Sequence, residues 1–352
     1  MAAWPAKKKK DDETQTLQLP RELPSAVVGE TRRLAFYVTP LSAKGLLSQQ
    51  IRDALKALER QAGSNSVLQI RAFVAGSGDL RRVRDLVSET FTERKQALPA
   101  LSLVQAGGLP MEGAQVVLEG IAGAKKELSP GGLAFISAQV ASSGNPRDPV
   151  APLAEKSLAA LRQAVAAAGA DASDVLRVTC FLSSLDNLAA TRQRAQADYG
   201  RAALNYVQTQ RAPQAALAAC EAVAALRKNP NGRLQLLDPE ALPRREGESQ
   251  IALVGAPYVV LTGTQVSFGY QEQDGRLALE RVRKALEPLG VSPADVAFAR
   301  FYPLSNKIED QVRSLRRGFF GAGRPSASSV LPVEGLSSLD GGFAVDVVAA
   351  KD

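Results

Sequence analysis

Histidine is absent from the 352 residues of this chain, and cysteine occurs only twice. Without an imidazole group, every mechanism that uses a histidine base is excluded, including Ser-His and Cys-His nucleophile pairs. A zinc site built from cysteine and histidine is excluded too, and two cysteines are too few for an all-cysteine site. We therefore expect no metal and no cofactor, and acid–base catalysis is disfavoured.

The two cysteines, Cys180 and Cys220, cannot build a disulfide framework. Both stand in apolar, strand-like context, which favours buried thiols over a single bridge. No apolar stretch approaches the roughly 18 residues that cross a membrane. The lysines at Lys7–Lys10 have no apolar run behind them, as a secretory signal would require. These features predict a cytoplasmic protein with no membrane partner.

Aromatic residues make up only 5% of the chain, so stacking platforms for single-stranded nucleic acid are sparse. The net charge of +7 is basic, but the basic side chains alternate with acidic ones, as in Arg81, Arg82 and Asp85. This mixture is typical of solvated helix faces. We do not expect a nucleic-acid partner, although the basic charge leaves one open.

One pattern occurs three times in the chain. The stretches Val67–Phe91, Val175–Tyr199 and Val296–Phe320 align without a gap, and each has a β-prone run, a polar turn and a helix that ends on an aromatic residue. Their first residues are separated by 108 and 121 positions, from 67 to 175 and from 175 to 296. This spacing is too long for a solenoid and suits whole domains. We infer one domain made three times.

Each repeat is predicted to run β-β-α-β-α-β-β or close to it. The helices have one apolar face each, so they should cover one face of a sheet in an α+β domain. The other faces of the three sheets would then cover one another around a pseudo-threefold axis. The third repeat is expected to open with the strand Ile251–Val254. The predicted boundaries are a flexible tail at 1–30, domains at 31–126 and 127–228, a linker at 229–248, and a domain at 249–352.

Several short motifs in these repeats resemble the RidA/YjgF/UK114 family. They are Ser137-Ala-Gln139 on an early strand, Cys220-Glu-Ala-Val-Ala224 on a closing strand, Leu98-Pro-Ala-Leu-Ser-Leu-Val104, and Leu261-Thr-Gly-Thr-Gln265. The resemblance covers nearly everything after about residue 33. It implies a chorismate-mutase-like fold, which in this family forms homotrimers with a ligand cleft between subunits. By resemblance, this chain is a trimer fused into one polypeptide, an intramolecular pseudo-trimer with three inequivalent clefts.

The resemblance also implies an activity, because active members of the family are imine and enamine deaminases. Their arginine, in a Pro-Ala-Arg-Ser context, clamps the substrate carboxylate through a bidentate pair. Here the matching positions are Leu101, Leu204 and Ala327, none of which can bind a carboxylate. The carboxylate of the final strand persists as Glu119, Glu221 and Asp346. An acid without its arginine would repel an anionic substrate, so we expect a degenerate site.

Two readings remain open for the polar residues near the predicted clefts. The three final-strand acids either line a cleft or are structural, paired with Arg71, Arg177 and Arg300, and we favour the structural reading. The other candidates either bind a ligand or satisfy backbone groups at the seams between repeats. These candidates are Ser137, Gln139, Thr264, Gln265, Tyr206 and Arg211, of which Arg211 is the best candidate for an anion contact.

The sequence thus leaves three hypotheses for function. The first is a catalytically degenerate RidA-like protein that binds a small metabolite or acts as a scaffold or regulator. The second is an enzyme of the deaminase or endoribonuclease-like type with altered chemistry in one cleft. The third is a structural protein with higher-order self-assembly.

Overall fold

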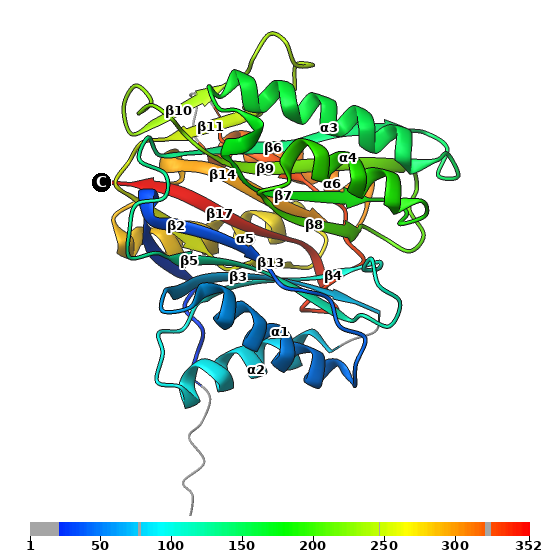
Figure 1. The fold of residues 1–352 in the computed structure, drawn as a ribbon, viewed down its shortest axis with the longest axis horizontal. Helices are drawn as coiled ribbons and strands as arrows, with labels where there is room; N and C mark the ends of the chain where they lie inside the picture. Colours follow the sequence, from blue (N-terminus) through cyan, green and yellow to red (C-terminus); the bar gives the residue numbers. More distant parts are fainter. Residues whose placement is uncertain (1–20, 77–78, 246, 321–324) are drawn as a thin grey trace, which may run out of the picture.

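The structure is a computed structural model that describes residues 21–76, 79–245, 247–320 and 325–352 (Figure 1). The expected α+β class is confirmed: this part of the chain forms three sheets and six α-helices. The residues Met1–Pro20 of the predicted tail lie outside the described residues.

The first sheet has the strand order β16-β4-β3-β5-β2. Its strands are β2 (Leu34–Val38), β3 (Ser66–Ala75), β4 (Ala100–Ala106), β5 (Val116–Gly123) and β16 (Gly335–Leu336). The helices α1 (Leu47–Ala62) and α2 (Leu80–Glu93) pack on it. Side chains alternate along β3: Ile70, Ala72 and Val74 join the cluster under the helices, while Phe73 joins a cluster on the opposite face.

The second sheet has the order β10-β11-β6-β9-β7-β8. Its strands are β6 (Leu133–Ser143), β7 (Val175–Leu182), β8 (Ala203–Gln208), β9 (Ala216–Ala225), β10 (Leu234–Leu237) and β11 (Ile251–Val254). The helices α3 (Val150–Ala167) and α4 (Leu188–Tyr199) contribute to its core. A 3-10 turn, Ala172–Asp174, leads into β7.

The third sheet has the order β1-β12-β17-β14-β15, with β13 also paired to β17. Its strands are β1 (Ala26–Glu30), β12 (Tyr258–Thr262), β13 (Gln265–Phe268), β14 (Val296–Pro303), β15 (Ala327–Val330) and β17 (Gly341–Lys351). The helices α5 (Glu272–Leu286) and α6 (Asn306–Phe319) complete its core. A 3-10 turn, Pro293–Asp295, leads into β14.

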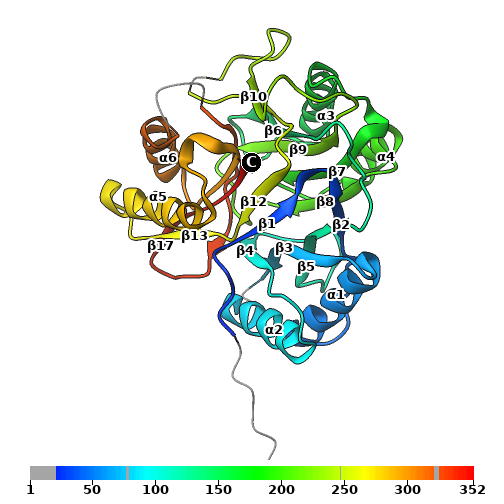
Figure 2. The same cartoon turned by 90° about the vertical axis from the view of Figure 1, so that its left-hand side faces the viewer.

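The helix pairs lie on the outside and the sheets turn their other faces toward the middle (Figure 2). One apolar cluster there contains Phe73 of the first sheet, Phe181 of the second and Tyr302 of the third. The rings of Phe73 and Phe181 meet edge to face, with 5.7 Å between their centroids. Burial of the inner faces thus joins the three sheets.

Two strands lie where the sequence predicted none, and a third, predicted strand joins another sheet. The predicted tail includes Ala26–Glu30, which instead forms β1 and pairs antiparallel with β12. The predicted linker includes Leu234–Leu237, which forms β10. Ile251–Val254 pairs with β6 of the second sheet instead of opening the third repeat. The pairings of β1 and β11 join segments far apart in the sequence, and local propensity cannot specify them.

The two cysteines form a disulfide, which corrects the expectation of free thiols. Cys180 on β7 and Cys220 on β9 stand directly opposite each other in an antiparallel pair, with 4.1 Å between their Cα atoms. Such directly opposed positions bring side chains close together. Both cysteines are fully buried under α3 and α4. The 40-residue separation conceals this pairing until the strand register is known.

No helix in the described ranges is long and apolar enough to cross a membrane.

Candidate functional site

The three sheets meet along three seams, and extra strands cover the edge at two of them. At the first, β11 pairs with β6, and β10 pairs with β11. At the second, β1 pairs with β12, and β16 reaches from the third repeat to pair with β4. At the third seam, β2 ends the first sheet and β8 ends the second. Nothing in the described part of the chain adds a strand between them.

One end of this third seam is closed by a tight turn. The backbone N–H of Gly107 donates to the carbonyl of Gln208 at the end of β8, with an N···O distance of 2.9 Å. A Cβ atom on Gly107 would lie 2.6 Å from the backbone of Gln210, and one on Gly108 would lie 2.5 Å from the side chain of Gln208. At Gly107 the contact is with backbone atoms, so only glycine permits the close approach there.

Beyond that turn, the seam opens into two adjoining hollows, which we call the β2–β8 cleft. Their volumes are about 730 and about 430 Å³. Val38, Thr39 and Leu204 line both. Leu128, Leu176 and Val38, which are not fully buried, give the larger hollow an apolar wall. Each hollow by itself falls in the range of roughly 300–1,000 Å³ that is typical of sites for small molecules.

The cleft has basic and polar groups above this apolar wall. Arg201 lines the larger hollow, and Arg192 of α4 lines the smaller one. The Arg192 guanidinium lies 5.7 Å from the centroid of the Tyr206 ring. Burial raises the pKa of Tyr206 to about 12, so its hydroxyl stays protonated and can donate a hydrogen bond. Neither hollow has an Asp or Glu among its lining residues, so the cleft favours anions.

Asn205 connects the cleft to the centre of the molecule. It lines the smaller hollow, and its Nδ2 donates to Oε1 of Glu119 at 2.8 Å. The Oγ1 of Thr179 donates to the same oxygen at 2.6 Å. Sequence reasoning missed Asn205 and Thr39, because neither lies in a motif. The signal that could have found Asn205 is its place beside Leu204, the position of the family arginine.

A buried charge cluster lies behind the cleft, and it contains all three final-strand acids. We call Arg71, Arg177, Arg300, Glu119, Glu221, Asp346 and Tyr302 the central cluster. Arg71 donates to Oε2 of Glu119 at 2.7 Å and to Oε1 of Glu221 at 2.8 Å.

The remaining pairs complete the central cluster. Arg300 donates to Oε1 of Glu221 at 2.8 Å and to Oδ1 of Asp346 at 3.2 Å. Arg177 lies 3.4 Å from Glu119. Each of the six charged residues is at most 3% exposed. The reading of these acids as structural partners of the strand arginines agrees with the contacts.

The pairing fixes the ionisation of the acids. Burial raises the pKa of Glu221, but Arg300 and Arg71 outweigh it and lower that pKa to about 2. Burial is likewise outweighed at Glu119, whose pKa is lowered by Arg71 and Arg177. At Arg177, burial dominates and lowers the pKa to about 10. Glu119, Glu221 and Arg177 are therefore charged near neutral pH. The formal charges of the three arginines and three acids of the central cluster sum to zero.

The other predicted ligand residues lie at the covered seams. Ser137 is fully buried, and its backbone N–H donates to the carbonyl of Gln250. Gln139 bonds the carbonyl of Ser137 at 2.9 Å. Thr264 accepts from the N–H of Leu103 at 3.3 Å, across the seam between the third and first sheets. These contacts satisfy backbone groups, as one of the two readings expected.

Two further candidates have other surroundings. Gln265 opens β13 and is half-buried, opposite Val345. Arg211 is exposed, and its guanidinium lies 3.5 Å from Glu334 of the third repeat. Its backbone N–H also donates to Glu334, at 2.8 Å. Arg211 does not line either hollow, so the structure brings only Tyr206 of the six polar candidates to the β2–β8 cleft.

The positions of the family arginine differ in their surroundings. Leu204 is half-buried and lines the cleft. Leu101 lies in the core under α1 and α2, 8% exposed. Ala327 is fully buried opposite Phe298. Of the three, only the position of Leu204 faces open space in the described part of the chain.

No protein-family model matches the chain, and neither does any curated protein. Several solved structures are similar. A conserved Rid-family protein of unknown function from Yersinia pestis is 17% identical, with a TM-score of 0.32, and the match covers 34% of this chain and 100% of that one. A YjgF/YER057c/UK114 family member from Mycobacterium tuberculosis is 22% identical, with a TM-score of 0.24, covering 34% and 99%. These neighbours are RidA/YjgF/UK114 family proteins. At such identities and TM-scores they say nothing about activity, which we argue from this chain's own contacts.

Proposed function

We propose that this chain is a fused pseudo-trimer of three RidA-like domains that no longer hydrolyses imines and binds a small metabolite in the β2–β8 cleft. The main observation behind the proposal is that the three seams between the sheets differ in whether added strands cover them. Added strands cover two strand edges, while β2 and β8 leave a hollow between them. A fused chain can keep one cleft open and close the others, because its repeats need not be identical.

The loss of catalysis is supported by two features of the site. Leu204 stands where the resemblance puts the carboxylate-binding arginine, and its side chain offers no hydrogen bond. Glu119 is held by Arg71, Thr179 and Asn205, so its carboxylate is not free to position a water molecule in the cleft. The cleft therefore lacks the arginine that binds the substrate carboxylate in the family, and its acid is not available to position water.

The ligand that best fits the cleft is a small anion with an apolar body. Leu128, Leu176 and Leu204 offer the apolar wall, while Arg192 and Arg201 are exposed arginines that line the same cleft. Ion pairs with exposed arginines contribute less binding free energy to an anion than a buried bidentate arginine does. We therefore expect moderate affinity in which the apolar contact contributes a large share.

Phenylpyruvate and pyruvate test this proposal, because they share a 2-oxo acid and differ in the apolar body. In titrations followed by NMR, phenylpyruvate should bind saturably and pyruvate should bind about tenfold or more weakly, since burying a phenyl ring is worth roughly 1.5–3 kcal/mol. The double variant Arg192→Gln/Arg201→Gln should weaken binding. Arg276→Gln, an exposed pair with Glu272 on α5, is the matched control and should leave binding unchanged.

A second measurement addresses catalysis directly. 2-Iminopropionate, generated in the assay, should disappear at the same rate with and without the protein. Clear acceleration would show that one cleft retains the deaminase chemistry, and the degenerate reading would then be wrong. Absence of saturable phenylpyruvate binding would overturn the cleft proposal while leaving the result on catalysis intact.

A further inference from the structure

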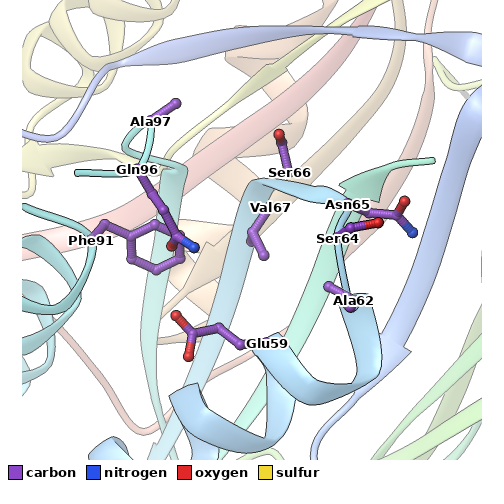
Figure 3. Close-up of a pocket in the computed structure, with 10 residues that line it drawn as sticks. Glu59, Ala62, Ser64, Asn65, Ser66, Val67, Phe91, Gln96 and Ala97 are labelled. Atoms are coloured by element: carbon purple, nitrogen blue, oxygen red, sulfur yellow. The ribbon is translucent and has the colours of Figure 1, made fainter. Parts of the chain in front are cut away.

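A second cavity lies in the first repeat, between the end of α1 and the end of α2 (Figure 3). We call it the α1–α2 cavity, and its volume is about 210 Å³. Ala62, Val67 and Phe91 form its buried wall, and Glu59 lies beside them. The mouth is polar and is lined by Ser64, Asn65, Ser66 and Gln96. It shares no lining residue with the β2–β8 cleft.

The other two repeats fill the equivalent position with apolar side chains. Each first helix ends at a glycine with positive φ: Gly63, Gly169 and Gly290. Four residues before that glycine, the second repeat has Val165 and the third has Leu286, both buried in the core under the helices. The first repeat has Glu59 at this place. The chain thus contains two internal controls in which the residue at this position has no carboxylate.

The helix ends differ in a second way that keeps the cavity open. In the second repeat, the N–H of Ala170 bonds back to the carbonyl of Val165, and Ala170 is buried. In the third, Val291 bonds back to Leu286 in the same way. Both are Schellman caps with the usual apolar contact across the cap.

The first helix of the first repeat ends with a hydrogen bond that spans four positions instead of five. It runs from the N–H of Gly63 to the carbonyl of Glu59, at 2.8 Å. The residue after the glycine is Ser64, which is exposed. Three residues separate Gly63 from Val67, whereas five separate the glycine from the valine in each of the other repeats. The shorter loop therefore leaves out the apolar residue that would fill the space.

The carboxylate of Glu59 is only half used. Its Oε2 is ion-paired with Arg94, which follows α2. Its Oε1 is buried and has no hydrogen-bond partner among the residues that the structure describes. In Figure 3, this carboxylate and the ring of Phe91 point toward the same space. A buried carboxylate oxygen without a hydrogen-bond donor destabilises the folded protein. A ligand that brings a donor into the cavity removes this penalty, and the difference contributes to its binding free energy.

We propose that the α1–α2 cavity is a binding site for a small organic cation, a primary alkylammonium or an alkylguanidinium. Its N–H donates to Oε1 of Glu59 in a charge-assisted hydrogen bond, and Arg94 keeps Oε2. The ring of Phe91 offers its face to the cation or packs against the alkyl chain. The cavity is smaller than the roughly 300 Å³ at which sites for drug-sized molecules begin, which limits the ligand to a short chain. This proposal is independent of the β2–β8 cleft.

The test uses n-butylammonium as the probe and the full chain as the protein. In NMR titrations, its addition should give saturable shifts at the end of α1 and around Gln96. Glu59→Gln keeps the shape of the side chain and removes its charge, so it should weaken binding about tenfold or more. n-Butanol has the same alkyl chain and no charge. It should bind the wild-type protein about as weakly as n-butylammonium binds Glu59→Gln.

Two variants separate charge from folding. Glu59→Leu copies Leu286 of the third repeat and should abolish binding while raising the melting temperature, because it fills the cavity with apolar surface. Glu280→Gln on α5 is the exposed control and should leave the affinity unchanged, since its carboxylate pairs with Arg283 and does not line the α1–α2 cavity. The proposal is overturned if n-butylammonium gives no saturable shift, or if Glu59→Gln binds it as tightly as the wild type.

Discussion

The guanidinium of Arg71 in the first sheet donates to the carboxylate of Glu221 in the second sheet, with 2.8 Å between Nη1 and Oε1. Arg300 of the third sheet donates to the same oxygen, also at 2.8 Å. Glu221 is therefore a point at which all three sheets meet. Its charge neutralises arginines from two other sheets, so the assembly of the inner core and the ionisation of this acid depend on each other.

This relationship predicts a large loss of stability when Arg71 is replaced. Arg71→Met keeps much of the volume but leaves Glu119 and Glu221 short of a donor. Removing one partner of a buried pair costs roughly 3–5 kcal/mol. Denaturant unfolding should therefore show a lower unfolding free energy by about that amount. Arg283→Met, which breaks exposed pairs on α5, is the control and should cost less than about 1 kcal/mol. Similar losses for both variants would contradict the role of the cluster.

The acid limb of the stability curve should also report on Glu221. Its pKa is about 2 in the folded protein, below its ordinary value of 4.5. Between these values the unfolded chain binds a proton and the folded one does not, so the unfolding free energy falls as the pH falls. The contribution is complete above pH 4.5 and is lost by about pH 2.

Denaturant midpoints measured from pH 6 to pH 2 check this prediction. Glu221→Gln should have a lower unfolding free energy at pH 6. This free energy should also fall less steeply with decreasing pH, because the variant lacks the carboxyl group whose pKa differs between the folded and unfolded states. Glu272→Gln, on the exposed face of α5, should keep the slope of the wild type. An unchanged slope in Glu221→Gln would mean that another group carries the acid dependence.

The sequence predicted well those features that depend on local pattern. Each helix was expected to have one apolar face, and in α1 this face consists of Ile51, Leu55 and Leu58, which are buried against the first sheet. The three aligned stretches were predicted to open with strands at Val67, Val175 and Val296. The structure has strands there: β3 begins at Ser66, β7 at Val175 and β14 at Val296.

Features that depend on long-range pairing were beyond the sequence. β1 lies within the predicted tail at 1–30, yet it pairs with β12 more than 200 positions away. The cleft could not be located either, because it exists only where β2 and β8 remain without an added strand. The motifs directed attention to Ser137 and Gln139, which lie at a covered seam.

The disulfide between Cys180 and Cys220 gives a third prediction. A loop of about 40 residues closed by a bridge is worth roughly 4 kcal/mol in the loop-entropy account. The double variant Cys180→Ala/Cys220→Ala should lose stability of that order in denaturant unfolding. Both cysteines are fully buried, so the bridge should resist reductant until the protein unfolds.

Mass spectrometry checks the bridge separately from stability. Protein denatured without reductant should take up no iodoacetamide, and protein denatured with reductant should take up two equivalents, one for each cysteine. Uptake of two equivalents without reductant would show free thiols. Equal stability of the double variant and the wild type would show instead that the bridge forms but contributes nothing.

The last prediction returns an arginine to the place where the family has one. Leu204→Arg puts a guanidinium on the wall of the β2–β8 cleft, at a half-buried position with space in front of it. We expect this variant to fold, with a loss of about 1 kcal/mol or less, and to bind phenylpyruvate about tenfold more tightly through a charge-assisted pair. Ala327→Arg introduces the same group at a fully buried position and should be severely destabilised, because a charged guanidinium would be placed in the core. Titration and denaturant unfolding of the two variants separate an open cleft from a closed one. If both variants fold equally well and neither binds the 2-oxo acid more tightly, the difference between the seams has no functional meaning.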